Sequence, residues 1–314
     1  MSELIEILAP IFVLIILGFL SVKLRFLSSD DYPVLSSFVM KVAFPCLLLT
    51  KLSVLDLSKH FRWDILIIFL VCSLALAIVS ISFFHRVLRR GYTLSVLEGG
   101  IGASLSNNGF IGYPILFLIF ASPPMTTYAT VLLVENLIMI PTIIFLLLHS
   151  QSPTADTFDN KLFGQTIRPL LTNPIIISVA IAAIFSSTSL YLPESIFRPL
   201  SLLGTIAAPL ALFTIGMALI ARPSLGDWTD IAWTSFGKLI LHPTLVALCC
   251  LLFVDNFQDP NVYAVILLAS SPMASLYPVF GAQYGAPGLT ASCLSATTFL
   301  SLFTISGWIL FLGI

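Results

Sequence analysis

Residues 106–114 read SNNGFIGYP, and 164 positions further along the chain residues 270–278 read SSPMASLYP. The two stretches share their first serine and their final Tyr-Pro pair. Working outward from them, residues 1–150 map without a gap onto residues 165–314 at the same offset. Four prolines of the first half meet prolines of the second: Pro10 with Pro174, Pro45 with Pro209, Pro114 with Pro278, and Pro123 with Pro287. Weak internal repeats of this kind are typical of secondary transporters, so we expect two structural repeats.

The segment between the repeats, residues 151–164 (QSPTADTFDNKLFG), is the most polar stretch of its length in the chain. The whole chain is strongly apolar: 58% of its residues are hydrophobic, 9% are charged, and the mean hydropathy is +1.05. A soluble globular domain carries about 25% charged residues, so that class is excluded. The net charge of −1 indicates no nucleic-acid partner. The five cysteines lack C-x-x-C spacing, so they are interpreted as packing residues, and no metal site or cofactor is expected.

A helix needs about 20 apolar residues to cross the hydrocarbon core. Reading between the polar clusters predicts ten such helices: residues 4–22, 33–53, 64–85, 94–119, 125–149, 167–187, 198–220, 229–253, 261–284 and 289–312. Five fall in each repeat. Because five is odd, the second repeat enters the membrane from the opposite face, which makes the repeats inverted. We therefore expect an all-α polytopic membrane protein in which both repeats form one integrated transmembrane domain.

Lysine and arginine in the loops predict the orientation, since cytoplasmic loops carry an excess of both. Eight follow the odd-numbered helices: Lys23, Arg25, Arg86, Arg89, Arg90, Lys161, Arg168 and Arg222. Four lie on the other side: Lys51, Lys59, Arg62 and Arg198. We expect the first set, with the linker at residues 151–164, to be cytoplasmic, and both termini to be on the non-cytoplasmic side.

Helices four and nine carry helix-breaking residues near their middles, Gly112 and Pro114 in helix four and Pro278 in helix nine. Proline removes one backbone donor and clashes with the carbonyl four residues earlier. Backbone groups that lack a helical hydrogen bond are tolerated inside a membrane only where they face protein or water. Breaks at matching positions therefore predict a midplane binding site, with free amides for an anion. The residues expected to bind substrate there are Asn107, Asn108, Gly109, Ser270, Ser271 and Pro272. An ordinary proline kink is the alternative.

The stretch SNNGFIGYP resembles the Asn-x-Gly-Phe-x-Gly-x-Pro signature of the auxin efflux carrier family, which includes bacterial malonate-type carriers. The segments LALFTIGMAL (residues 210–219) and SSPMASLYPVFGAQYG (residues 270–285) are similar to the corresponding family segments. The run Ala-Ser-Leu-Tyr in the latter departs from the usual pattern. The resemblance implies ten helices, two broken helices that cross at the site, transport of small organic anions, and elevator-like motion of helices three to five and eight to ten. The bile-acid/sodium symporters share a similar architecture, which leaves sodium coupling open.

Charged residues inside membrane spans are costly and usually mark ion or proton paths. Glu135 lies beside Asn136 in helix five, and it is interpreted either as an ion- or proton-coupling group or as half of a structural ion pair with Lys41 or Lys238. Lys238 either balances the charge of an anionic substrate or extends toward the head groups. His242, in the same helix, is a candidate proton relay.

These features together predict a secondary active carrier, for efflux or exchange, of a small organic anion such as a mono- or dicarboxylate in the bacterial inner membrane. The coupling ion is left open between H⁺ and Na⁺. A sodium-coupled symporter of another substrate class and a membrane sensor or channel are the alternatives. The chain has no H-E-x-x-H or G-x-S-x-G motif, so no catalytic residue is assigned and an enzyme is not expected. The expected partners are the organic anion and the lipid bilayer, with a homodimer left open.

Overall fold

The computed structural model describes residues 2–28, 30–55, 61–151, 171–188, 190–218 and 227–314, and every regular element in these ranges is a helix. The predicted linker, apart from Gln151, lies outside the described residues, as do four of the loop cations used for orientation: Lys59, Lys161, Arg168 and Arg222. The chain divides into two compact units, each built from segments of both sequence halves. The first unit comprises Met1–Arg62, Gly109–Ala129 and Thr172–Arg222; the second comprises Trp63–Asn108, Thr130–Leu171 and Pro223–Ile314.

Six helical segments among the described residues are long and apolar enough to cross a membrane. They are Asp31–Leu52, Trp63–Arg86, Met125–Ser150, Glu194–Ala218, Trp228–Phe253 and Pro287–Leu312. Four further apolar helical stretches are shorter: Phe12–Lys23, Asn108–Ile119, Pro174–Ser187 and Pro260–Ser270. The all-helical fold is thus confirmed, and six of the ten predicted spans meet the length of about 20 residues that a crossing requires.

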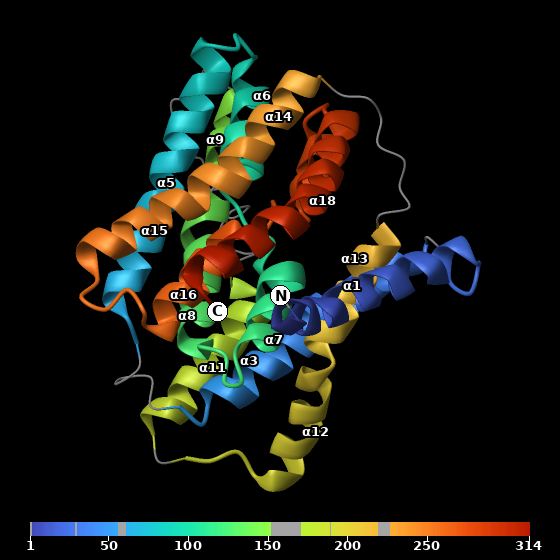
Figure 1. Cartoon of the computed structure of the whole chain (residues 1–314), viewed down its shortest axis with the longest axis vertical. Coiled ribbons are helices and arrows are strands. Elements are labelled where there is room, and N and C mark those ends of the chain that lie inside the picture. The colour runs from blue at the N-terminus through green and yellow to red at the C-terminus, as the bar shows by residue number, and fades with distance from the viewer. Residues whose placement is uncertain (1, 29, 56–60, 152–170, 189, 219–226) are drawn as a thin grey trace. The chain divides into compact units, whose positions relative to one another are not determined.

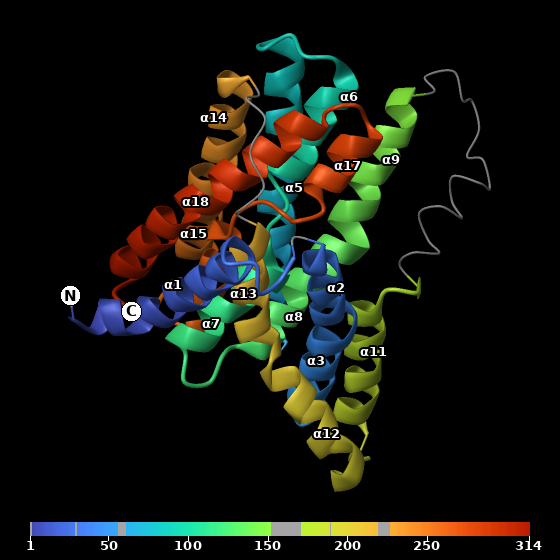
Figure 2. The same cartoon turned by 90° about the vertical axis from the view of Figure 1, so that its right-hand side faces the viewer.

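The first unit contains α1 (Ser2–Lys23), α2 (Asp31–Phe38), η1 (Val39–Ala43), α3 (Phe44–Leu52), α7 (Tyr113–Ile119), α11 (Pro174–Ser187), α12 (Glu194–Thr205) and α13 (Ala207–Ala218). Helix α3 packs against both α11 and α12, as Figure 2 shows. Helix α1 packs along α13. A Cβ atom at Gly216 would overlap the carbonyl oxygen of Ile15, so glycine is what permits this contact. Small residues let membrane helices approach closely in this way.

The second unit contains α5 (Trp63–Arg86), α6 (Tyr92–Ser95), η2 (Val96–Gly102), η4 (Val134–Met139), α9 (Ile140–Gln151), α14 (Trp228–Phe236), η5 (Gly237–Leu241), α15 (His242–Phe253), α16 (Pro260–Ser270), α17 (Tyr277–Gln283) and α18 (Pro287–Leu312). Figure 1 shows α14 and α15 (orange), joined through η5, as one continuous helix. Segment η2 lies at the centre, because α5, α9, α14, α17 and α18 all pack against it. Gly99 permits the closest of these contacts, since a Cβ there would overlap the backbone of Ile81 in α5.

Wide π-helical turns precede several prolines inside these helices. The turns η1, η3 (Asn108–Gly112), η4 and η5 end two residues before Pro45, Pro114, Pro141 and Pro243, respectively. In η5, for example, the His242 amide donates to the carbonyl of Gly237, five residues earlier. A proline ring clashes with the carbonyl four residues back, and the wider turn relieves that clash. Helices that contain proline therefore continue through it.

Candidate substrate site

Two apolar segments of the second unit are interrupted and pair with each other at the interruption. Segment η2 ends at Gly102 and helical structure resumes at Asn108, while α16 ends at Ser270 and α17 begins at Tyr277. The Asn107 amide donates to the Pro272 carbonyl at 2.7 Å, and the Ala274 amide donates to the Leu105 carbonyl at 3.2 Å. Ser106 and Met273 form the resulting antiparallel bridge. Non-helical backbone is tolerated at membrane depth only when protein or water supplies partners, and here the two breaks supply partners for each other.

The residues predicted to break the helices lie just after these interruptions. Gly112 and Pro114 lie within the continuous run of η3 and α7, and Pro278 is the second residue of α17. Proline is favoured in the first turn of a helix, where its missing N–H has no intrahelical partner to lose. Pro278 therefore fits the first turn of α17, whereas Pro114 follows the wide turn η3 inside a helical run, and both lie after the interruptions rather than at them.

Three of the predicted substrate-binding side chains have hydrogen-bond partners within the crossing. The Asn107 side-chain amide donates to the Ser275 hydroxyl at 2.8 Å. The hydroxyls of Ser270 and Ser271 both donate to the Leu267 carbonyl of α16, at 2.8 and 3.4 Å. These hydrogen bonds hold the interrupted segments in place.

Asn108 and Ser106 differ, because their side chains are buried without such partners. Neither amide atom of Asn108 nor the Ser106 hydroxyl makes a hydrogen bond of ordinary geometry, although both groups interact with the neighbouring Glu135 carboxylate. The Ser106 backbone amide donates to Glu135 Oε1 at 3.0 Å. A buried polar group left unsatisfied costs about 1–3 kcal/mol. The crossing thus holds hydrogen-bonding capacity that the chain itself does not fully use.

A fully buried ammonium lies at the end of α16, next to the second interruption. Lys238 Nζ donates to the Ala269 carbonyl at 2.6 Å, near the C-terminal end of α16, where the helix dipole favours a cation. It also lies 2.9 Å from His242 Nδ1, and His242 Nε2 lies 3.0 Å from the Ser73 hydroxyl. Because an ammonium only donates, Nδ1 accepts and Nε2 carries the ring proton toward Ser73. The charges of Lys238 and Glu135 interact, so the structure brings these two predicted residues together.

The other predicted residues lie elsewhere. Lys41 is exposed on η1 of the first unit. Asn136 is half-buried, and its side-chain amide donates to the Leu132 carbonyl of its own helix at 2.8 Å. Gly109 belongs to the first unit, where a Cβ atom would lie 3.1 Å from Met40 Sδ. None of these three joins the Lys238–Glu135 group within the second unit.

A second buried carboxylate, Glu98 in η2, was missed by the sequence reasoning. It accepts hydrogen bonds from the hydroxyls of Thr234 and Tyr277, the latter at 2.5 Å, and its Oε2 lies 3.8 Å from Cys293 Sγ. The available signal was an acid within the predicted span 94–119.

An ion-pair network lies at one end of α14. Arg90 pairs with Asp227 and with Asp230, the latter at 3.0 Å. The Thr229 backbone amide and Arg90 together hold the pKa of Asp227 below its ordinary value. Hydrogen bonds to the two aspartates raise the pKa of Arg90. Arg90 and Asp227 therefore stay charged near neutral pH.

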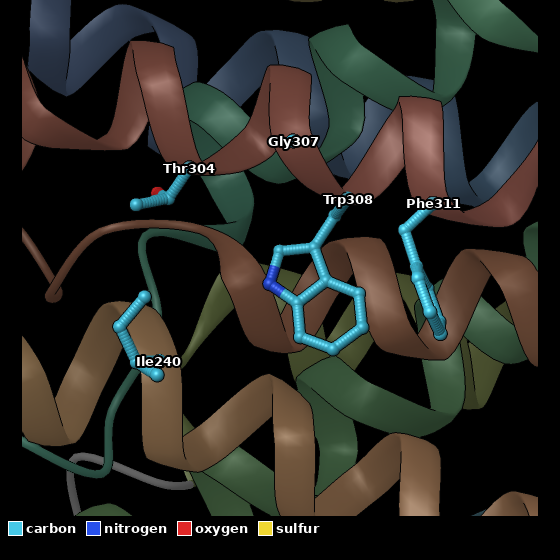
Figure 3. Close-up of a pocket in the computed structure, with 5 residues that line it drawn as sticks. All are labelled: Ile240, Thr304, Gly307, Trp308 and Phe311. Carbon is cyan, nitrogen blue, oxygen red and sulfur yellow. The ribbon is translucent and has the colours of Figure 1, made fainter.

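A cavity of about 320 Å³ lies between η5 and α18 and is lined by Ile240, Thr304, Gly307, Trp308 and Phe311 (Figure 3). Trp308 and Phe311 extend from the same helix, with Ile240 facing them. The lining is almost entirely apolar and includes none of the buried polar groups described above, which makes it unsuitable for a charged substrate. Within the described residues, no group of three or more His, Cys, Asp or Glu side chains is placed to hold a metal ion.

Comparison with known proteins identifies the family. Residues 3–309 match the family model described as "Membrane transport protein". The chain is 28% identical over 317 residues to a "Putative malonate transporter" of Rhizobium meliloti, covering 98% of this chain and 95% of that protein. It is 25% identical over 315 residues to an "Uncharacterized transporter" of Methanothermobacter thermautotrophicus, covering 96% of each. The chain is therefore a multi-pass integral membrane protein that belongs to the membrane transport protein family, the auxin efflux carrier family that its motifs resemble.

Proposed function

We propose that this protein is a secondary carrier of a small organic anion, a mono- or dicarboxylate, and works by efflux or exchange. The observation that carries the proposal is the incompletely used hydrogen-bonding capacity of Asn108 and Ser106, buried at the crossing of two interrupted segments. A carboxylate accepts several hydrogen bonds and donates none. The Asn108 amide and the Ser106 hydroxyl are donors suited to such a group.

The neighbouring charges set the energetics of this site. Lys238 supplies a buried positive charge, whereas the Glu135 carboxylate competes with any anion for the Ser106 amide. Two carboxylates close together repel each other, and a shared proton relieves the repulsion. We therefore assign Glu135 as the group that couples anion binding to a proton, with Na⁺ as the alternative coupling ion.

Alternating access follows from an inverted ten-helix arrangement made of repeats 1–150 and 165–314. The helix bounds support it: α7 and α17 both begin at the tyrosine of a Tyr-Pro pair, 164 residues apart, and both have seven residues. The division into two compact units supports an elevator-like motion, because the second unit contains the crossing and most of predicted helices three to five and eight to ten. In this arrangement both termini are non-cytoplasmic and the membrane is the cell's inner membrane.

The substrate class rests on chemistry, and the relative's name supplies a first candidate. The name of the Rhizobium meliloti protein refers to malonate, a small dicarboxylate of the kind that the buried donors suit. The first transport assays should therefore compare malonate with succinate, pyruvate and an uncharged analogue.

Counterflow in proteoliposomes of the purified protein tests the proposal. Asn108→Ala removes a donor to a charged ligand, worth about 1.5–3 kcal/mol or roughly a 10- to 100-fold loss of affinity. Asn256→Ala, which removes an amide from an exposed loop, is the matched control and should leave counterflow unchanged. Saturable carboxylate counterflow weakened only by Asn108→Ala supports the carrier. The absence of carboxylate counterflow with folded protein, or equal activity in both variants, would refute the proposal. Imposed pH and Na⁺ gradients then distinguish the two coupling ions.

A further inference from the structure

The Glu98 carboxylate is completely buried and is surrounded by donors from three helices. Thr234 of α14 and Tyr277 of α17 donate through their hydroxyls, and Cys293 of α18 lies at thiol hydrogen-bond distance. All three neighbours favour a charged acceptor, because hydrogen bonds to a carboxylate stabilise its ionised form. Among the residues that the structure describes, no salt bridge involves Glu98.

The hydrogen bond between Glu98 and Tyr277 joins the two interrupted segments away from their backbone contacts. Glu98 lies in η2, eight residues before Ser106, and Tyr277 is the first residue of α17. Space around the bond is limited, because a Cβ atom at Gly102 would lie 3.2 Å from the Tyr277 ring. A change in the charge of Glu98 therefore acts directly on Tyr277, the first residue of α17.

A row of buried polar side chains runs along the helix that faces Glu98. The polar row consists of Asp230, Thr234, Lys238 and His242, spaced four residues apart. In an α-helix that spacing drifts around the axis by about 40° per step. The wider turn at η5 reduces the drift, so the row stays on the buried side from α14 into α15.

One end of the polar row has access to water. The side chains of Arg90 and Asp227 are 30% and 44% exposed, whereas Asp230, which pairs with Arg90, is 3% exposed. Thr234 follows Asp230 by one helical turn and donates to Glu98, and the charges of Asp230 and Glu98 interact. Ionisable groups thus lead from the surface to Glu98.

We propose that the Glu98 carboxylate is a proton-binding site, that protons reach it from the Arg90–Asp227 end of the polar row through Asp230, and that protonation weakens the hydrogen bond from Tyr277. The proton comes from water, is taken up by the Asp230 carboxylate, and passes to Glu98, after which Asp230 is again ionised beside Arg90. The neutral acid carries an O–H donor of its own. The neutral acid is also a weaker acceptor than the carboxylate, so the hydrogen bond from Tyr277 weakens.

The groups that act on the Glu98 charge come from three of the elements packed on η2. They are Asp230 and Thr234 on α14, Tyr277 on α17, and Cys293 on α18. Helices α5 and α9 contribute the backbone at Ile81 and the aliphatic side chain of Ile143. This site goes beyond the proposed transport function, because it requires no particular substrate.

Infrared difference spectroscopy of the reconstituted full-length protein during acidification tests the proposal without any substrate. Wild type should show a carbonyl band from a protonated carboxylic acid, and Glu98→Gln should remove one component of it. Glu135→Gln should leave that component in place, and Glu194→Gln, at an exposed acid, is the matched control. A difference spectrum unchanged by Glu98→Gln would overturn the proposal and would leave the transport proposal standing.

Two further variants keep the test decisive if Glu98→Gln fails to fold. Tyr277→Phe removes one donor to the carboxylate and should move the midpoint of the Glu98 band to higher pH by about one unit. Asp230→Asn should slow the rise of the band after a rapid pH drop and leave its final amplitude intact. An unshifted midpoint in Tyr277→Phe would refute the coupling between Glu98 protonation and Tyr277, and an unchanged rate in Asp230→Asn would refute the route.

Discussion

Replacing Lys238 with methionine tests whether the buried charges at the crossing stabilise the fold as a pair. The substitution keeps an unbranched side chain but removes the ammonium. It leaves the Ala269 carbonyl and His242 Nδ1 without the donor they share, and it leaves the Glu135 charge without its interacting cation.

The expected cost follows from these lost partners. Removing one member of a buried charge pair typically destabilises a protein by about 3–5 kcal/mol, because the other charge stays buried and uncompensated. For a chain of this size each kcal/mol corresponds to roughly 2 °C in melting temperature, so Lys238→Met should melt about 6–10 °C below wild type. Glu135→Gln should be destabilising as well. The double variant should regain part of the loss, with a coupling energy of about 0.5–3 kcal/mol.

Thermal unfolding of the purified variants in one detergent, followed by exposure of the five cysteines to a thiol-reactive dye, measures these values. All five thiols are free in the structure. Additive effects of Lys238→Met and Glu135→Gln, with no recovery in the double variant, would refute the inference that the two charges act as a pair.

Three other predictions concern the crossing, the first unit and the surface network. Asn107→Ala should weaken counterflow less than Asn108→Ala, because the backbone bond of Asn107 to Pro272 remains and its side-chain amide already donates to Ser275 within the chain; equal losses would contradict the distinction. Gly216→Ala should lower the melting temperature by several degrees through overlap with the Ile15 carbonyl, whereas Gly307→Ala, with open space at its Cβ, should not. Arg90→Ala should lower the melting temperature at pH 7. The lowered pKa of Asp227 stabilises the fold above its ordinary value of 3.8 and loses that effect as pH falls through the folded value, so the difference between Arg90→Ala and wild type should shrink in acid. If the difference in melting temperature did not change with pH, the Arg90–Asp227 interaction would be excluded as its cause.

Some features of the site were accessible from local sequence, and others were not. Polar residues within apolar spans marked Asn107, Asn108, Glu135 and Lys238, and the structure places all four in the second unit. The neighbouring residues in the sequence do not show which of the two asparagines, Asn107 or Asn108, has a side-chain amide that is not fully hydrogen-bonded. That difference depends on Ser275, which lies 168 residues from its partner Asn107.

The helix interruptions show the same division. The Tyr-Pro pairs lie close to both breaks, but the breaks lie at residues 103–107 and 271–276, before these pairs. Proline rules describe what a residue cannot do inside a regular helix. These rules do not include the wider turns that let a helix continue through Pro114 and Pro243. They also do not include the backbone pairing between the two interrupted segments, which allows the helix to break at residue 107.

Hydropathy, the internal repeat and the family motif by themselves determined that this protein is an all-helical membrane transporter, because apolar length and local residue order are properties of the chain. Tertiary structure alone decided which polar groups are satisfied. Glu98 meets its donors 136 to 195 residues away, and Lys238 meets the Ala269 carbonyl 31 residues away on another helix. A hydrogen bond requires two groups within about 3 Å in a defined orientation, and packing between distant helices sets that distance.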